Sequence, residues 1–398
     1  MKFVLYTNSV SAHQLPLARE LVKRLGAENF RYVYTGENLQ RGNQEVAADE
    51  PWIIRLAADE TFTLLLSCDI LLVGGIYPID LMEQRLAAGK KTLYMSERWF
   101  KPIEMGVGGR CWCRLPGWVR MLHPGYFRRA RRLAKMLSGP NCWYLPIGPW
   151  AAKDMRLVQR LTFSGCAANP FVPWGYFVAP SSHSTVQPPL SNSQTSKPQN
   201  IQTSKPFPLS RSLRVLWVGR MLDWKCVDTI IRAVALANSQ AFKRSNGQTF
   251  KLTLVGDGPE NPRLQKLASK LLNFQTSKPL ILQPPFSITF LPPVPLEEVR
   301  SLMRQHDIYV LASNAQEGWG AALSEALSEG MACLGTFEAG ASAALLPCDN
   351  LFHAGDYRSL ADVLTGRDVG GMTLPYVFTP KGAAGRLIEM IAAQRRSI

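Results

Sequence analysis

The sequence lacks any apolar run long enough to span a bilayer, which takes about 20 consecutive apolar residues. The most apolar stretch, Phe62 to Ile76, is interrupted by Asp69. The residues after Met1 lack the long apolar core and small-residue cleavage site of a signal peptide. Cysteines are few, eight in 398 residues, and only Cys111 and Cys113 lie close together, which falls short of a zinc site. We therefore expect a cytoplasmic protein with reduced thiols and no membrane-spanning segment.

Acidic residues are also scarce. The chain has 30 Asp and Glu against 45 Lys and Arg, which gives a formal net charge of +15, and no acid occurs from Met155 through Leu222. Such a balance predicts an anionic partner: nucleic acid, an acidic membrane surface or a phosphorylated substrate. Apolar residues make up 46% of the chain, which excludes collagen, a coiled coil and wholesale disorder.

Short apolar runs alternate with helical stretches in both halves of the chain. Fully apolar strands separated by helices are typical of parallel sheets covered on both faces, so we expect an α/β protein with two such sheets. Ligands of these sheets bind outside the carboxyl ends of the strands, which here predicts a cleft between the two domains. We expect strands at 2–7, 30–35, 69–75, 92–95, 212–219, 250–258, 287–291, 307–313 and 332–337, and helices at 15–25, 227–237 and 261–272.

Residues 178–211 have a different composition, rich in Pro, Ser, Gln, Asn and Thr. The pentapeptide Gln-Thr-Ser-Lys-Pro occurs there twice and again at 275–279, and an inert insertion is favoured over a binding motif. This material cannot bury a core, so we expect a disordered linker. The expected domains are 1–177 and 212–380, and a C-terminal helix within 381–398 is expected to pack back on the first domain.

The strongest chemical signal is the segment from Glu317 to Glu325, which reads Glu-Gly-Trp-Gly-Ala-Ala-Leu-Ser-Glu. It follows an expected strand and enters a helix near Gly320, so free backbone N–H groups at the helix N-terminus can bind a phosphate. Glu317 lies just before the helix and Glu325 about two turns into it, where carboxylates accept hydrogen bonds from sugar hydroxyls. A helix with ordinary surface acids would show the same spacing, so the context decides.

Two further turns supply that context. Arg220 and Lys225 follow the strand at 212–219, and two cations at the carboxyl end of a parallel strand are placed to clamp a pyrophosphate. Gly256-Asp-Gly258-Pro follows the next strand, where a flat base could lie close to the backbone.

Together and in this order, the three segments resemble the donor-binding domain of the retaining GT-B glycosyltransferases of family four, the glycosyl transferases group 1 type. The resemblance covers about residues 212–365 and rests on the pattern Gly-Arg…Lys-Gly, Gly-x-Gly-Pro and Glu–x7–Glu. It implies two Rossmann-like parallel-sheet domains that face each other across a cleft, the first binding the acceptor and the second the nucleotide-sugar donor. The chain departs from the pattern at Cys226, where the family has Gly, and at Pro292-Pro293, which replace another glycine.

The resemblance also implies a role for each matching residue. Arg220 and Lys225 would bind the donor diphosphate and Glu317 would contact the transferred sugar, which makes these three the predicted catalytic residues. Glu325 would bind the ribose hydroxyls and Val294 would lie beside the base. The other predicted donor-binding residues belong to the three turns: Gly219, Gly256, Gly258, Gly318, Trp319, Gly320 and Ala321.

Acceptor contacts are expected from the first half of the chain. His13 follows the first strand and Glu97 follows the strand at 92–95, so both would face the cleft, and His123 is a third candidate. Ordinary loop or core roles are the alternative for each. Residues 118–137 form a basic amphipathic stretch that could lie on an anionic leaflet, although a buried apolar stripe with a solvated basic face would have the same pattern.

The implied activity is transfer of a sugar from a UDP- or GDP-sugar to an acceptor hydroxyl, with retained configuration. The implied enzyme is a hexosyltransferase of cell-surface polysaccharide or glycolipid synthesis, peripheral on the inner face of the membrane, with a glycan or lipid-linked acceptor. No Asp-x-Asp motif occurs, which agrees with a donor site that needs no metal or other cofactor. The alternatives are a nucleotide-sugar epimerase on the same fold, a non-catalytic nucleotide-sugar sensor and a nucleic-acid-binding protein, although no nucleic-acid-binding motif is recognisable.

Overall fold

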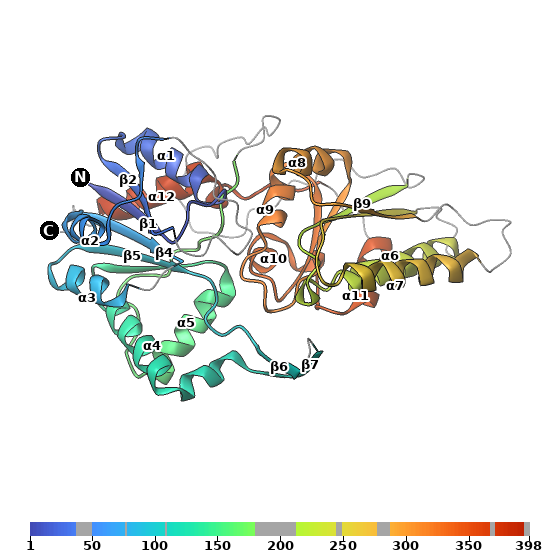
Figure 1. Cartoon of the computed structure of the whole chain (residues 1–398), viewed down its shortest axis with the longest axis horizontal. Coiled ribbons are helices and arrows are strands. Elements are labelled where there is room, and N and C mark those ends of the chain that lie inside the picture. Colours follow the sequence, from blue (N-terminus) through green and yellow to red (C-terminus); the bar gives the residue numbers. More distant parts are fainter. Residues whose placement is uncertain are drawn as a thin grey trace. The chain divides into compact units, whose positions relative to one another are not determined.

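The computed structural model describes residues 1–36, 50–75, 78–107, 110–179, 212–243, 249–276, 287–366 and 371–393. The chain divides into two compact units, coloured along the sequence in Figure 1. The first unit is Met1–Ala179 with Val377–Ile398, and the second is Pro180–Tyr376. The expected linker lies outside the described residues from 180 onward, as do the pentapeptides at 194–198 and 202–206 and most of the one at 275–279.

The first unit is built on a six-stranded parallel sheet in the order β3-β2-β1-β4-β5-β8. The middle of β4 is buried on both faces, as its continuous apolar run predicts. The strands are β1 (Phe3–Thr7), β2 (Phe30–Tyr34), β3 (Ile53–Ile54), β4 (Ile70–Gly74), β5 (Lys91–Ser96) and β8 (Cys142–Pro146). The helices are α1 (Leu15–Leu25), α2 (Ala58–Ser67), α3 (Ile79–Ala87), α4 (Pro124–Leu137) and α5 (Pro149–Leu161).

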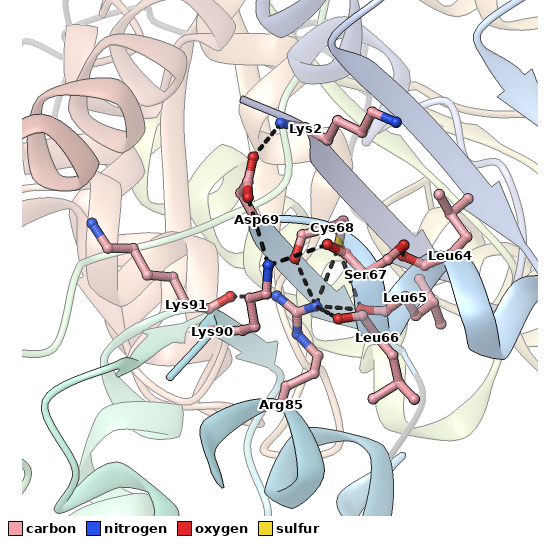
Figure 2. A network of polar contacts seen from close by, with 10 residues as sticks. All are labelled: Lys2, Leu64, Leu65, Leu66, Ser67, Cys68, Asp69, Arg85, Lys90 and Lys91. Carbon is pink, nitrogen blue, oxygen red and sulfur yellow. Dashed lines mark hydrogen bonds and ion pairs between the residues drawn. The ribbon is translucent and has the colours of Figure 1, made fainter. Parts of the chain in front are cut away.

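A buried arginine ties three elements of this unit together (Figure 2). The Arg85 side chain extends from α3, is fully buried, and donates to the carbonyls of Leu65 and Cys68 at the end of α2. It also donates to the carbonyl of Lys91 at the start of β5, over 2.8 Å. The last carbonyls of a helix lack donors within the helix and carry partial negative charge, so a cation satisfies both needs. Burial lowers the pKa of Arg85 and raises the pKa of the Cys68 thiol beside it.

The second unit repeats this topology. Its six parallel strands lie in the order β11-β10-β9-β12-β13-β14, so in both sheets the first and fourth strands are neighbours, as in a Rossmann sheet. The strands are β9 (Leu213–Val218), β10 (Phe250–Val255), β11 (Ser287–Leu291), β12 (Ile308–Leu311), β13 (Ala332–Thr336) and β14 (Leu351–Phe352). The helices are α6 (Val227–Lys243), α7 (Asn261–Thr276), α8 (Leu296–Gln305), α9 (Ala321–Ser328), α10 (Gly340–Leu345) and α11 (Tyr357–Gly366).

The last helix, α12 (Pro380–Ala393), belongs to the first unit and packs against α1. Arg24 of α1 donates to the carbonyl of Lys381 over 3.1 Å, and the Lys91 ammonium donates to the carbonyl of Ile391 over 3.1 Å. The chain therefore leaves the first unit and returns to it. Within the described parts of the chain, every helix is too short or too polar to cross a membrane.

The basic stretch at 118–137 forms a short 3-10 helix, η2 (Gly117–Leu122), followed by α4. The apolar stripe of α4 is buried in the first unit, through Ala130, Leu133, Ala134 and Leu137. Because this stripe is buried, it is not available to contact lipid. The structure therefore agrees with the alternative of a buried apolar stripe with a solvated basic face. The exposed apolar side chains lie in η2 instead: Leu122 is 74% exposed and Trp118 is 45% exposed.

Candidate functional site

Two loops of the second unit meet where the strand order of its sheet reverses. One follows β9 and carries Lys225, and the other follows β12 and carries Glu317. The backbone N–H of Asn314 donates to the carbonyl of Trp224 over 2.9 Å and joins the loops. This switch point between the first and fourth strands is the place where open parallel sheets bind their ligands.

The two loops bring the predicted catalytic residues Lys225 and Glu317 into contact. The Lys225 ammonium donates to Glu317 Oε2 over 2.5 Å, and the two side chains are 18% and 11% exposed. The ammonium also lies over the Trp224 ring, 4.3 Å from its centroid. Such a shielded, charge-assisted contact is stronger than a surface ion pair. The sequence placed these residues 92 positions apart, and the fold makes them one site.

The Glu317 carboxylate has one engaged oxygen and one open oxygen. Oε2 also accepts a hydrogen bond from Ser313 Oγ over 2.9 Å, whereas Oε1 has no partner within the described ranges. Ser313 is held in turn by Thr336, whose hydroxyl donates to the Ser313 carbonyl over 2.5 Å. The Asn314 side chain is 6% exposed, and its Nδ2 has no partner in the described structure. The site thus has an open acceptor on Glu317 and a buried donor on Asn314.

Glycines let the turns after β9 and β10 approach closely. A Cβ atom on Gly256, where φ is +130°, would lie 1.9 Å from the Gly219 carbonyl oxygen, so no larger residue fits. The next turn is held by Asp257, which accepts hydrogen bonds from the Gly258 N–H and the Asn261 side chain. These hydrogen bonds, first that of Asn261, lower the pKa of Asp257.

Helix α9 begins after Gly320, which adopts a positive φ of +97°. Glu325 is buried in its second turn, nearer the start than the two turns expected from the sequence. Glu325 and Glu317 both add to the effect of burial that raises the pKa of Tyr309 on β12. The Trp319 ring is buried and donates to Ser324 Oγ over 3.0 Å, and the Trp319 carbonyl accepts a hydrogen bond from the Ala341 N–H over 2.8 Å. Gly318 and Ala321 lie on either side of the Trp319–Gly320 turn at the start of α9.

The remaining donor-side residues lie in neighbouring loops. Arg220 is exposed in the loop that carries Lys225, and its guanidinium has no partner among the described residues. Val294 is half-buried in the loop after β11, next to the exposed Pro292 and Pro293. Cys226 has φ +49° and ψ +41°, the left-handed conformation that a glycine adopts without strain.

The first unit gathers two of the three predicted acceptor-side residues. The His13 ring stacks on Tyr176 with centroids 5.6 Å apart, and the Tyr176 hydroxyl donates to Glu97 Oε1 over 2.7 Å. The Lys101 ammonium contacts Glu97 Oε2 over 2.8 Å. His123 lies elsewhere: it is exposed and caps α4, where its Nδ1 accepts a hydrogen bond from the Tyr126 N–H over 3.4 Å.

Ser313, Asn314 and Tyr176 complete these clusters and were not predicted. The polar run Ser-Asn-Ala-Gln between a buried strand and Glu317 was an available signal for the first two residues. Tyr176 had none, because its contacts join segments 79 positions apart. Among the described residues, no three His, Cys, Asp or Glu side chains gather as a metal site would require.

Comparisons with known proteins agree with this geometry. Residues 212–365 match the family model of glycosyl transferases group 1. A search of curated proteins gave no match. Among solved structures, the lipopolysaccharide outer core galactosyltransferase WaaB in its apo form is 14% identical, with a TM-score of 0.59 over 99% of this chain and 100% of WaaB.

Two further structures have the same fold. Alr3699/HepE from Anabaena, in complex with UDP, is 12% identical with a TM-score of 0.57, and each chain is covered completely. A structure from E. coli named for trehalose-6-phosphate, bound with UDP-2-fluoro glucose, is 10% identical with a TM-score of 0.52 over 99% of this chain and 96% of that one. The chain has the GT-B fold of these glycosyltransferases, and its residues 212–365 match the glycosyl transferases group 1 family.

Proposed function

We propose that the protein transfers a hexose from a UDP- or GDP-sugar to an acceptor hydroxyl with retention of configuration. The observation that carries the proposal is the Lys225–Glu317 pair at the switch point of the second sheet, with one carboxylate oxygen open. The match to glycosyl transferases group 1 supports a transferase. The neighbours that hold UDP or a UDP-sugar support a nucleotide-sugar donor.

In this proposal the protein mainly stabilises the charge that develops on the leaving nucleoside diphosphate. Lys225 and Arg220 supply positive charge, and the backbone N–H groups at the start of α9 supply hydrogen bonds. Glu317 Oε1 accepts a hydroxyl of the transferred sugar. Glu325 binds the ribose and Val294 lies beside the base. This set of groups needs no metal ion.

The acceptor is proposed to bind the first unit through His13 and Glu97. The contacts that support this role are the stack of His13 on Tyr176 and the hydrogen bond from Tyr176 to Glu97, which fix both groups after β1 and β5. We propose a glycan or lipid-linked acceptor and a place in cell-surface polysaccharide or glycolipid synthesis. Glu97→Gln should raise KM for the acceptor and leave donor affinity unchanged. A variant in which only donor affinity changes would contradict the acceptor role of Glu97.

The donor role is tested with Arg220→Ala. Because Arg220 is exposed and unpaired in the described structure, its removal should leave the fold intact. Turnover should fall by about 10²-fold or more, since the lost charge acts mainly in the transition state. Arg232→Ala, which removes an exposed cation from α6, is the matched control and should behave as wild type.

Thermal unfolding with UDP, GDP and their sugars, in EDTA, completes the test. Ligand at 100 times its Kd adds about 2.7 kcal/mol of stability, an easily measured shift. A shift with one diphosphate that survives EDTA supports a metal-independent donor site. Near wild-type turnover in Arg220→Ala would overturn the assignment, and no shift with any diphosphate would favour the sensor or nucleic-acid alternatives. Product formed without acceptor would indicate an epimerase.

We also propose that the first unit rests on an anionic membrane surface on the cytoplasmic side. Arg128, Arg131 and Lys135 are exposed on one side of α4, and the exposed Trp118 and Leu122 precede that helix. Cations beside exposed apolar side chains are typical of surfaces that contact acidic lipid. Sedimentation with vesicles tests this proposal.

A further inference from the structure

We propose that Ser313 is a positioning residue of the donor site, which keeps the Glu317 carboxylate directed at the transferred sugar while Lys225 binds the diphosphate. The inference rests on the proposed function. Lys225 is expected to bind the diphosphate as well as Glu317, and the question is what holds the Glu317 carboxylate in its orientation when it does.

Glu317 Oε2 receives two hydrogen bonds from different loops. Lys225 reaches it from the loop after β9 over 2.5 Å, and Ser313 Oγ reaches it from the end of β12 over 2.9 Å. Ser313 is fully buried, and the buried hydroxyl of Thr336 on β13 donates to its carbonyl over 2.5 Å. Ser313 is therefore fixed by two neighbouring strands of the sheet, whereas Lys225 reaches the carboxylate on a flexible stem.

A bound diphosphate would compete with Glu317 for the Lys225 ammonium. It carries more negative charge than one carboxylate, and the three donors of an ammonium can be shared or transferred. Ser313 cannot move to the ligand, because it is buried and held from both sides. Its hydroxyl therefore keeps Oε2 engaged and leaves Oε1 open in the same direction. Without that hydrogen bond the carboxylate can rotate about its side-chain torsions.

The test is the variant Ser313→Ala. Calorimetry measures its affinity for UDP or GDP and for the matching nucleotide sugar, and an activity assay measures its turnover. Affinity for the bare nucleotide should stay at the wild-type value, because Ser313 is fully buried and its hydroxyl is engaged by Glu317. The affinity for the nucleotide sugar relative to the bare nucleotide should fall by about 10- to 100-fold, and kcat should fall by a similar factor. This is the effect expected from losing one hydrogen bond to a charged group. Ser313→Thr keeps the hydroxyl and should recover most of kcat.

Ser342→Ala is the matched control, because Ser342 is also fully buried in the second unit and its Oγ has no partner in the described structure. It should leave all three measurements unchanged. In a Glu317→Ala background, Ser313→Ala should add almost nothing, because residues that act through one another are not additive.

The inference is overturned if Ser313→Ala matches wild type, if it weakens bare nucleotide as much as nucleotide sugar, or if its effect persists in full without Glu317. Ser313→Thr with the same defect as Ser313→Ala, in a folded protein, would also overturn it. A wild-type protein that binds no nucleotide would overturn the proposed function itself, and the Ser313 inference with it.

Discussion

Cys226 adopts a backbone conformation that residues with a Cβ atom rarely take. At φ +49° it lies directly after Lys225, in the loop that positions that ammonium. The left-handed region costs such a residue about 1–2 kcal/mol, and a glycine avoids that cost but loses part of the gain through its greater freedom when unfolded. We predict that Cys226→Gly is more stable than Cys226→Ala by about 1 kcal/mol. Urea unfolding of the two variants measures the difference, and an alanine variant at least as stable as the glycine variant would contradict it.

At this scale the sequence predicted the residues whose chemistry repeats in a motif. The motifs singled out Lys225 and Glu317, which the fold brings into contact, and the roles given to these two residues and to Glu325 stay predictions. Ser313 and Tyr176 could not be assigned in the same way, because a serine or tyrosine after a strand has many uses. Their roles follow from side-chain hydrogen bonds, to Glu317 over 2.9 Å and to Glu97 over 2.7 Å, which depend on loop geometry. His123, in contrast, was predicted as an acceptor-side residue, and the structure places it at the N-cap of α4.

Helix α2 depends on a side chain from the next helix. Removal of Arg85 leaves the buried carbonyls of Leu65 and Cys68, and the partly buried carbonyl of Lys91, without this donor (Figure 2). We predict that Arg85→Met lowers the stability of the first unit by about 3 kcal/mol or more, because three carbonyls lose this donor and each buried group left without a partner costs about 1–3 kcal/mol. Arg19→Met is the control, because its exposed ion pair with Glu50 contributes at most about 1 kcal/mol.

Hydrogen exchange locates the effect of Arg85→Met. Amides of α2 and β5 should lose protection in that variant, and amides of β9 and β12 in the second unit should keep theirs. Unchanged protection in α2 would show that the guanidinium does not hold the end of this helix.

The elements that the sequence predicted are those with a clear apolar period. Strand β4 is a continuous apolar run and β1, β9 and β10 are mostly apolar, and the expected boundaries agree with the structure to within a few residues. Strand β3 has two residues, Ile53–Ile54, which is too short to form a pattern. The alternation of strands and helices also continues through β8 and α5, which the sequence did not predict. The antiparallel strands β6 (Ile103–Val107) and β7 (Arg110–Leu115) were not expected either. Tertiary pairing, rather than local preference, determines such segments.

At the scale of the whole chain, a single topology occurs twice. Both sheets place the first and fourth strands side by side, so each unit has a switch point at which loops diverge. The second unit uses that point for the Lys225–Glu317 pair, and the first carries His13 after its own first strand. The motifs of the sequence placed Lys225 and Glu317 in the loops after two strands of the second unit, and the structure brings these two residues into contact. In the first unit the sequence predicted His13 and Glu97 from their places after strands, but their contacts with Tyr176 required the structure.

With a net charge of +15, the protein could bind anionic membranes through its total charge or through one local surface. The last prediction distinguishes these two kinds of binding. If α4 contacts the membrane, replacing Arg128, Arg131 and Lys135 together by Ala should weaken binding to vesicles rich in anionic lipid. At about 1 kcal/mol per cation, the loss is about 100-fold. Replacing Lys251, Lys266 and Lys270 of the second unit changes the net charge equally and should have little effect.

Co-sedimentation with anionic and neutral vesicles, at low and high salt, measures both triple variants. Trp118→Ala should weaken binding at high salt as well, because its exposed ring contributes an apolar contact that salt does not screen. Equal losses in the two triple variants would mean that the protein binds through its total charge alone. In that case α4 has no special part in binding, and the basic composition would serve the anionic donor and long-range attraction rather than a docking surface.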